Sequence, residues 1–194
     1  MKLVAITGGI GSGKSVVSRI LRTMGYNVYD TDSEAKHIMA TSTAIKQSIT
    51  DEFGADTLDE KGNIVSANLA KAVFNNHAKL DTLNRIVHPA VIADVLRWAQ
   101  ELSDTICFVE TAILYESGLS EKVDSYWLVK APIDVRIERV MRRSSLTEEQ
   151  VRSRIASQST LLDANANYVI NNDGIEPLLP QIIEGLKIIL DVEV

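Results

Sequence analysis

The sequence has a single cysteine, Cys107, among its 194 residues. A lone cysteine excludes a disulfide framework, and its place in the apolar run 105–109 is typical of a packed core thiol rather than a nucleophile. All apolar runs are far shorter than the ~20 residues that a membrane-spanning helix needs, and the apolar start of the chain is too short for a signal peptide. We therefore expect a cytoplasmic protein with no membrane partner.

Positive charge is also scarce, because 20 basic side chains face 26 acidic ones and the net charge is −6. A generic nucleic-acid surface needs a basic face, so we expect small-molecule substrates at a local anion site and no nucleic acid. Repeats, low-complexity segments and Pro/Gly/Ser-rich linkers are absent. This favours one domain over residues 1–194, and we expect a monomer.

Five short apolar runs, rich in β-branched residues, predict buried strands, and helical patterns separate most of them. Strands that alternate with helices indicate an α/β fold with a parallel five-stranded sheet flanked by helices. The strand runs are 2–7, 27–30, 105–111, 125–130 and 168–171; the helical patterns are 14–24, 133–143, 148–158 and 177–190.

The interval from about residue 33 to 102 interrupts this alternation, because its apolar residues recur at helical spacing. We interpret it as an inserted helical subdomain that forms one wall of a substrate cleft, or else as a plain helical cover. The expected helices are 35–39, 44–53, 67–74, 80–87 and 90–102, with Pro89 at the first position of the last one.

A phosphate-binding loop of the form GxxxxGK[ST] lies between the first expected strand and the first helix, at residues 8–15. Its glycines let the backbone amides point inward at phosphates, Lys14 bridges the outer phosphates, and the Ser15 hydroxyl is placed to ligate Mg²⁺. The lysine excludes a dinucleotide fingerprint, and the chain lacks the Asn-Lys-x-Asp motif of a GTPase. We therefore predict a P-loop NTPase fold that uses ATP and Mg²⁺. The predicted ATP contacts here are Gly9, Ile10, Gly11, Ser12, Gly13, Lys14, Ser15 and Val16.

Two carboxylates, Asp30 and Asp32, follow the second expected strand. Strand alternation would send them to the same side, near the phosphate loop, where one would approach Mg²⁺ and the other would accept the proton of an attacking hydroxyl. We therefore predict that one of the two is a metal contact and the other the general base, with Glu110 as an alternative metal contact. Both aspartates could instead cap the helix expected to begin near Ser33.

Arginine is concentrated in the C-terminal half of the chain, where residues 136–154 contain six of the ten arginines. We interpret residues 136–165 as an Arg-rich lid over the transferring phosphate, with a solvated, ion-paired helix as the alternative. Arg139 and Arg143 are its predicted contacts, and Asn172, after the last strand, is expected near the adenine. The three histidines share no metal-ligand spacing, which excludes a zinc site.

These motifs, taken together, resemble the dephospho-CoA kinase family. The resemblance covers the whole chain and rests on segments 6–15, 29–32, 83–89, 113–118, 139–143, 154–158 and 169–174. The chain departs from the family pattern at Glu110, at Ser144, and between 158 and 167, where about two residues are missing.

The resemblance implies transfer of a phosphoryl group from ATP to the 3′-hydroxyl of the ribose of dephospho-CoA. It also implies that Asp32 is the base, Lys14 and Arg143 assist catalysis, and the helical insert holds the acceptor. Thr7, Asp32, Asn84 and His88 are then the expected substrate contacts. Two other functions stay open: a P-loop kinase for another small hydroxyl acceptor, such as a nucleoside monophosphate or a sugar acid, and an ATP-driven switch that binds a protein.

Overall fold

A computed structural model describes residues 1–74, 76–158 and 166–190 of the chain. The chain divides into two compact units, one made of residues 1–29 and 103–194 and the other of residues 30–102. Within the described residues, no helix has the length and apolar character that crossing a membrane requires.

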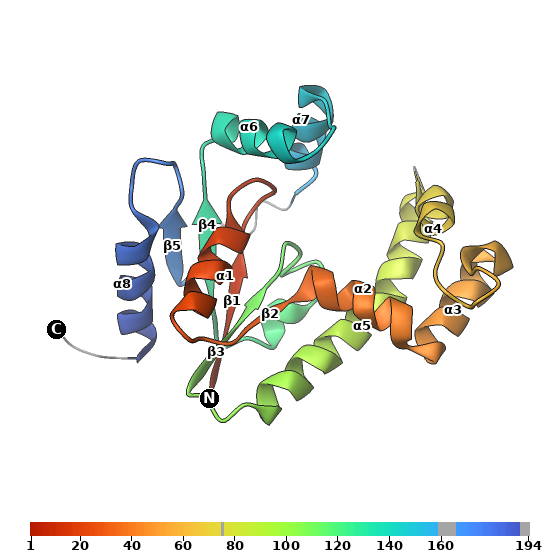
Figure 1. Cartoon of the computed structure of the whole chain (residues 1–194), viewed down its shortest axis with the longest axis horizontal. Helices are drawn as coiled ribbons and strands as arrows, with labels where there is room; N and C mark the ends of the chain where they lie inside the picture. The colour runs from red at the N-terminus through yellow and green to blue at the C-terminus, as the bar shows by residue number, and fades with distance from the viewer. Residues whose placement is uncertain (75, 159–165, 191–194) are drawn as a thin grey trace. The chain divides into compact units, whose positions relative to one another are not determined.

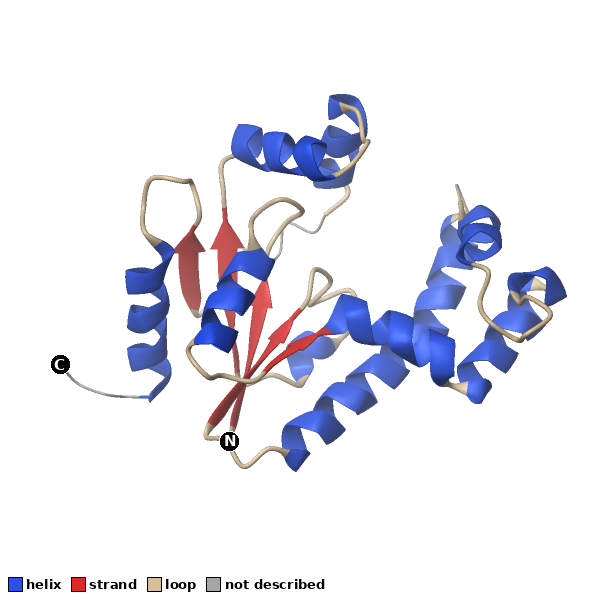
Figure 2. Cartoon of the chain, in the orientation of Figure 1, coloured by secondary structure: helices blue, strands red, loops and turns tan. Residues whose placement is uncertain are grey.

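The first unit is built on the predicted five-stranded parallel sheet, whose strand order is β2-β3-β1-β4-β5 (Figures 1 and 2). Register pairs join β1 to β3 and β4, and β4 to β5, all in parallel. The strands are β1 (Lys2–Thr7), β2 (Val28–Asp30), β3 (Ile106–Glu110), β4 (Ser125–Lys130) and β5 (Tyr168–Asn171). The predicted α/β fold is therefore confirmed.

The central strands are apolar along their whole length because both of their faces are buried. Val4 and Ile6 of β1 join one core cluster with α1 (Lys14–Thr23) and α8 (Leu178–Leu190). Leu3 and Ala5, which point to the opposite face, are equally buried. Such burial turns each strand into a continuous hydrophobic run instead of an alternating one.

Two further helices belong to this unit, α6 (Ile133–Arg143) and α7 (Glu148–Ala156). They pack on each other through a small cluster of Ile137, Val140 and Val151, and Ile10 of the phosphate loop packs against the same cluster. Figure 1 shows both helices beside the loop that joins β1 to α1. The apolar contact of Ile10 thus joins the loop to the α6–α7 pair. A 3₁₀ turn also lies in this unit, at Leu119–Glu121.

The second unit is helical, and its elements are α2 (Thr31–Thr41), α3 (Thr43–Phe53), a 3₁₀ turn (Ala55–Thr57), α4 (Ser66–Val73) and α5 (His77–Glu101). Helices α2, α3 and α4 each pack against α5. An isolated antiparallel bridge joins Leu58 to Ile64.

The prediction that Pro89 begins a helix is wrong, because α5 continues through it for 25 residues. Val87, Val91, Val95 and Ala99 form one buried stripe at four-residue spacing, and this stripe passes Pro89 without interruption. Pro89 itself is exposed. Burial along the stripe outweighs the hydrogen bond that proline cannot donate, so tertiary packing joins the two expected helices into one.

The prediction that strand alternation places Asp30 and Asp32 on the same side is also wrong. Strand β2 ends at Asp30 and α2 begins at Thr31, so Asp32 belongs to a helix. The Asp30 carboxylate accepts hydrogen bonds from the amides of Asp32 and Ser33, at 3.1 and 3.2 Å. This N-cap satisfies amides that a helix start leaves open, which is why the helix begins earlier than expected.

Candidate active site

The phosphate loop takes its shape from glycines that no other residue could replace without strain. Gly11 and Gly13 have positive φ angles of 78° and 100°, which side chains with a Cβ adopt rarely. A Cβ on Gly13 would also collide with the amide group of Asn172. The loop is therefore narrow on the side that faces the end of β5.

Helix α1 follows the loop directly, and no side chain caps its N-terminus. Its first turn contains no acidic residue, so no side chain of that turn competes with a bound anion for the positive end of the helix dipole. A helix start of this kind, entered from a glycine-rich loop, is a binding site for phosphate groups. The side-chain amine of Lys14 donates a hydrogen bond of 2.8 Å to the Gly8 carbonyl, which places it across the loop.

Two hydroxyl groups beside the loop are buried without a hydrogen-bond partner in the described part of the chain, Thr7 Oγ1 and Ser12 Oγ. Thr7 is the last residue of β1, and Ser12 lies inside the loop. Buried polar groups in folded proteins nearly always have a partner, and a ligand, an ion or a water molecule supplies it where the protein does not. This part of the loop therefore has unused hydrogen-bonding capacity.

Asn172 anchors the second half of the loop. It is only 8% exposed, and its side-chain amide donates to the Ser12 carbonyl at 2.8 Å. The guanidinium of Arg139 donates to the Asn172 carbonyl at 2.9 Å and to the Asn172 side-chain oxygen at 3.2 Å. The structure thus brings two predicted ATP contacts, Arg139 and Asn172, together at the loop.

The first half of the loop is held by two residues that were not among the predicted contacts, Arg136 and Gln158, which we call the Ile10 clamp. Arg136 Nε donates to the Ile10 carbonyl at 2.9 Å, and the Ile10 amide donates to Gln158 Oε1 at 2.8 Å. Arg136 also donates to the same Gln158 oxygen at 3.1 Å. Burial lowers the pKa of Arg136 from its ordinary value, but a guanidinium stays charged in proteins.

One sequence signal could have indicated the Ile10 clamp. The GxxxxGK[ST] pattern does not require glycine at positions 9 and 11, yet the chain has glycine at both. A Cβ on Gly9 would lie 2.7 Å from the Arg136 guanidinium carbon, and a Cβ on Gly11 would lie 2.6 Å from the Arg136 carbonyl oxygen. Extra glycines in such a loop indicate that another element approaches it closely.

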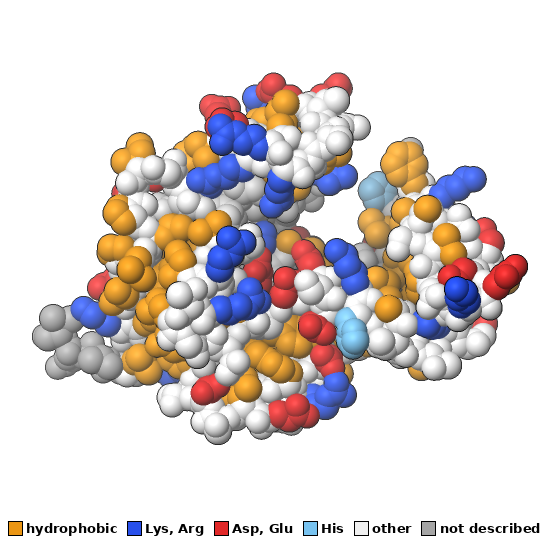
Figure 3. Space-filling model, viewed as in Figure 1, with side chains coloured by type: hydrophobic (Ala, Val, Ile, Leu, Met, Phe, Trp, Pro, Cys, Tyr) orange, Lys and Arg blue, Asp and Glu red, His pale blue; other side chains and the backbone are white. Residues whose placement is uncertain are grey.

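Arg143, the predicted lid arginine, is exposed at the C-terminal end of α6. Arg142 pairs with Glu138, and Arg152 with Glu148, as in the alternative of an ion-paired surface helix. Figure 3 shows Lys and Arg side chains gathered over α6 and α7 and over α1. Part of the predicted lid, residues 159–165, lies outside the described residues.

Three further predicted residues belong to the second unit. Asp32 is exposed in the first turn of α2, and Asn84 and His88 lie four residues apart on α5, both partly exposed. In the described part of the chain, His, Cys, Asp and Glu side chains form no group of three or more that could hold a metal ion. Mg²⁺ needs only one or two protein ligands when phosphates and water supply the rest.

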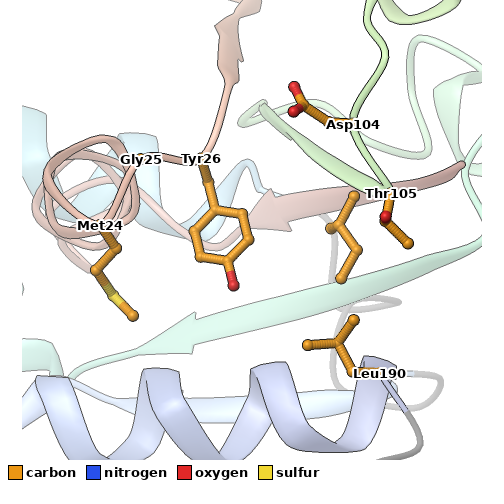
Figure 4. Close-up of a pocket in the computed structure, with 7 residues that line it drawn as sticks. Met24, Gly25, Tyr26, Asp104, Thr105 and Leu190 are labelled. Atoms are coloured by element: carbon orange, nitrogen blue, oxygen red, sulfur yellow. The ribbon is translucent and has the colours of Figure 1, made fainter.

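Among the cavities lined by described residues of the first unit, two lie at opposite ends of its sheet. One, of about 330 Å³, is at the carboxyl ends of β4 and β5, the end that carries the phosphate loop, and is lined by Lys130, Ala131, Pro132, Asn171, Asp173 and Glu176. The other, of about 270 Å³, is at the amino end of β3, with Met24, Tyr26 and Leu190 among its lining residues (Figure 4). Ligands in α/β sheets bind at the carboxyl ends of strands, which favours the first cavity.

Comparison with known proteins gives one consistent match. The sequence model of the dephospho-CoA kinase family matches residues 2–177. The dephospho-CoA kinase of Porphyromonas gingivalis is 40% identical over 190 residues, which cover 96% of this chain and 94% of that protein. The dephospho-CoA kinase of Bacteroides fragilis is 40% identical over 185 residues, covering 93% and 89%.

Solved structures agree with the sequence comparison. The crystal structure of TT1252 from Thermus thermophilus has a TM-score of 0.81 at 30% identity and covers 98% of this chain and 96% of its own. The dephospho-CoA kinase from Campylobacter jejuni has a TM-score of 0.69 at 25% identity, with coverage of 97% and 96%. Shikimate kinase from Acinetobacter baumannii, at 14% identity and a TM-score of 0.56 over 98% and 94%, shares the fold.

Proposed function

The chain belongs to the dephospho-CoA kinase family, and from this premise we propose how its residues carry out the reaction. The protein is a kinase that phosphorylates a hydroxyl group. It transfers the γ-phosphoryl group of ATP to the 3′-hydroxyl of the ribose of dephospho-CoA, and the products are CoA and ADP, as in the last step of CoA synthesis. The observation that carries this function is the family match over residues 2–177.

ATP binds with its phosphates in the loop of residues 8–15. The uncapped start of α1 and the loop amides supply partial positive charge, and Lys14 leaves the Gly8 carbonyl to contact the outer phosphates. The base of the nucleotide lies against the segment that follows β5, where Asn172 and Arg139 already interact and a cavity of about 330 Å³ is present.

Transfer begins with attack of the acceptor oxygen on the γ-phosphorus, while the bond from that phosphorus to the bridging oxygen of ADP breaks. Asp32 accepts the proton of the attacking hydroxyl. Its carboxylate is exposed at the first turn of α2, and the cap of that helix comes from Asp30. Lys14 and Arg143 offset the charge that develops on the transferred group.

Mg²⁺ fits the residues present. Its preferred ligands are oxygens, and the exposed Ser15 hydroxyl together with the Asp30 carboxylate is a donor set of that type. When bound, the ion neutralises charge on the β- and γ-phosphates. The Asp30 oxygens already accept three hydrogen bonds. These bonds fix the orientation of the carboxylate.

The acceptor is held by the helical unit. Asn84 and His88 are one turn apart on the same face of α5, so both can contact one ligand. Thr7, whose hydroxyl is buried without a partner in the described part of the chain, is the third contact from the predicted set. All of these residues come from one chain, so a monomer suffices.

The test is acceptor-dependent release of ADP from purified protein supplied with ATP and Mg²⁺. Dephospho-CoA should stimulate release by at least about 10²-fold, whereas a nucleoside monophosphate or shikimate should leave it near background. Equal release with and without any acceptor would contradict the kinase and indicate an ATPase. A Lys14→Ala variant controls for contaminating kinases, because ADP release by this protein should be lost in the variant, whereas release by a contaminant would remain.

A further inference from the structure

Ile10 of the phosphate loop is held on three sides by the α6–α7 pair. Its side chain packs against the cluster of Ile137, Val140 and Val151. Its amide donates to Gln158 Oε1 at 2.8 Å, and its carbonyl accepts from Arg136 Nε at 2.9 Å. Arg136 and Gln158 are also joined to each other, by a hydrogen bond of 3.1 Å from the guanidinium to the side-chain oxygen. Both polar groups of this residue therefore turn toward α6 and α7.

We propose that Arg136 and Gln158 are positioning residues of the kinase, which hold the Ile10 peptide so that the phosphate loop is already arranged for the nucleotide phosphates. This inference rests on the proposed function of the loop. Neither residue needs to touch ATP. Their effect passes through the loop backbone to the amides at its phosphate-binding side.

The physical reason is the cost of ordering a glycine-rich segment. Glycine has more backbone freedom than any other residue, so a free loop of this composition would populate many conformations. Any ordering that has to occur on binding is subtracted from nucleotide affinity. The Ile10 clamp removes that cost in advance, because it restrains one loop residue through its amide, its carbonyl and its side chain.

The clamp also links the loop to the C-terminal end of α7. Gln158 follows that helix by two residues, and its side-chain oxygen is shared by the loop amide and the Arg136 guanidinium. A change in the path of the chain at Gln158 would thus alter the loop directly. The segment predicted as a lid is therefore hydrogen-bonded to the phosphate loop through the Gln158 side chain.

A substitution at Gly9 would disturb the Ile10 clamp without changing either of its two residues. A Cβ there would overlap the end of the Arg136 side chain and lie 2.9 Å from Gln158 Oε1. The side-chain end is flexible, so alanine at position 9 would displace the guanidinium and leave the α6 backbone in place. Gly9→Ala should therefore reproduce the loss of Arg136.

The test compares Arg136→Met, Gln158→Leu and Gly9→Ala with wild type, using binding of a nonhydrolysable ATP analogue without acceptor and steady-state kinetics with acceptor. Each variant should raise the Kd of the analogue and the KM for ATP about tenfold, because a charge-assisted contact is lost. For Arg136→Met and Gln158→Leu, the kcat should stay within about threefold, and the KM for the acceptor should not change. A purely structural role would lower the melting temperature and the active fraction but leave the KM for ATP as it is.

Two comparisons separate the clamp from simpler explanations. Arg142→Met removes the same charge from the same helix, at an exposed side chain paired with Glu138, and should leave the KM for ATP within about twofold. Arg136→Lys keeps the charge but not the guanidinium fork, so it should recover only part of the affinity. Full recovery with lysine, or an equal effect of Arg142→Met, would overturn the clamp in favour of general electrostatics.

Additivity gives the final test. The double variants Arg136→Met with Gln158→Leu, and Arg136→Met with Gly9→Ala, should be at most about twofold worse than their worse single variant, since both changes remove one group. Effects that multiply would refute the clamp. The binding assay contains no acceptor, so it tests the clamp even if wild type fails to phosphorylate dephospho-CoA, and that failure would instead refute the proposed function.

Discussion

Asp30 and Asp32 lie two residues apart but differ in their place in the fold, and one pair of substitutions can separate the roles that we propose for them. Asp30 is the N-cap of α2 and accepts the amides of Asp32 and Ser33. Asp32 is an exposed residue of the first turn. We predict that Asp32→Asn lowers transfer to dephospho-CoA by at least about 10²-fold, because general-base catalysis contributes about 10² to 10⁴ and an amide cannot take the proton.

Stability should hardly change in the same variant. Asp32→Asn removes only the attraction of an exposed carboxylate to a helix N-terminus, which is about 0.3–1 kcal/mol. For a protein of this size, that corresponds to a shift in melting temperature of at most about 4 °C. Affinity for ATP should also stay close to that of wild type, because the phosphate loop is intact. The assay is therefore a comparison of kcat, ATP affinity and melting temperature on one preparation.

Asp30 supplies the matched control. Asparagine is as good an N-cap as aspartate, so Asp30→Asn should keep the melting temperature, whereas Asp30→Ala should cost about 1 kcal/mol. If Asp30 also contacts Mg²⁺, Asp30→Asn will raise the Mg²⁺ concentration needed for half-maximal rate. Full activity of Asp32→Asn would remove Asp32 from the mechanism. A loss of ATP affinity equal to its loss of rate would instead make Asp32 a metal or phosphate contact.

Three further outcomes are expected. Lys14→Ala should abolish transfer and leave the melting temperature within about 2 °C, because Lys14 is partly buried and its amine lies in the loop rather than in the core; activity within tenfold of wild type in the folded variant would be incompatible with its phosphate role. Proteolysis between Arg139 and Arg154 should slow when a nonhydrolysable ATP analogue binds, and indifference to nucleotide would identify a static surface segment. Burial, with added repulsion from Asp104 and Asp124, raises the pKa of the Cys107 thiol to about 11, so its reaction with a thiol reagent at pH 8 should be at least about 10²-fold slower than in the unfolded chain. Equal rates would contradict the buried placement of this residue.

The same pKa shift sets a direction for stability in alkali. The folded state keeps Cys107 protonated to higher pH than the unfolded state, whose thiol ionises near 9.0. The stability that depends on this group is therefore complete below about pH 9 and is lost as the pH rises through about 11. Replacing Cys107 with alanine should remove that part of the pH dependence, although the smaller side chain leaves a cavity.

Local sequence determined the sheet and the phosphate loop. The strands 125–130 and 168–171 and the helix 133–143 have the same bounds in the structure as in the prediction. Apolar runs flanked by turn residues, and a glycine-rich loop that ends in Gly-Lys-Ser, specify their conformation through neighbouring residues. The same holds for the family, whose motifs lie within short segments of the chain and whose match covers residues 2–177.

Tertiary structure decided where local preferences were overridden and which distant segments came into contact. Pro89 reads as a helix start from its neighbours, yet a buried stripe on both sides of it makes α5 one helix. Asp30 and Asp32 read as strand neighbours, yet the cap formed by Asp30 begins α2 at once. The Ile10 clamp joins residues 126 and 148 positions apart in sequence. A local sequence pattern cannot predict contacts between residues so far apart in the chain. Only the packing of α6 and α7 beside the loop brings Arg136 and Gln158 to the Ile10 peptide.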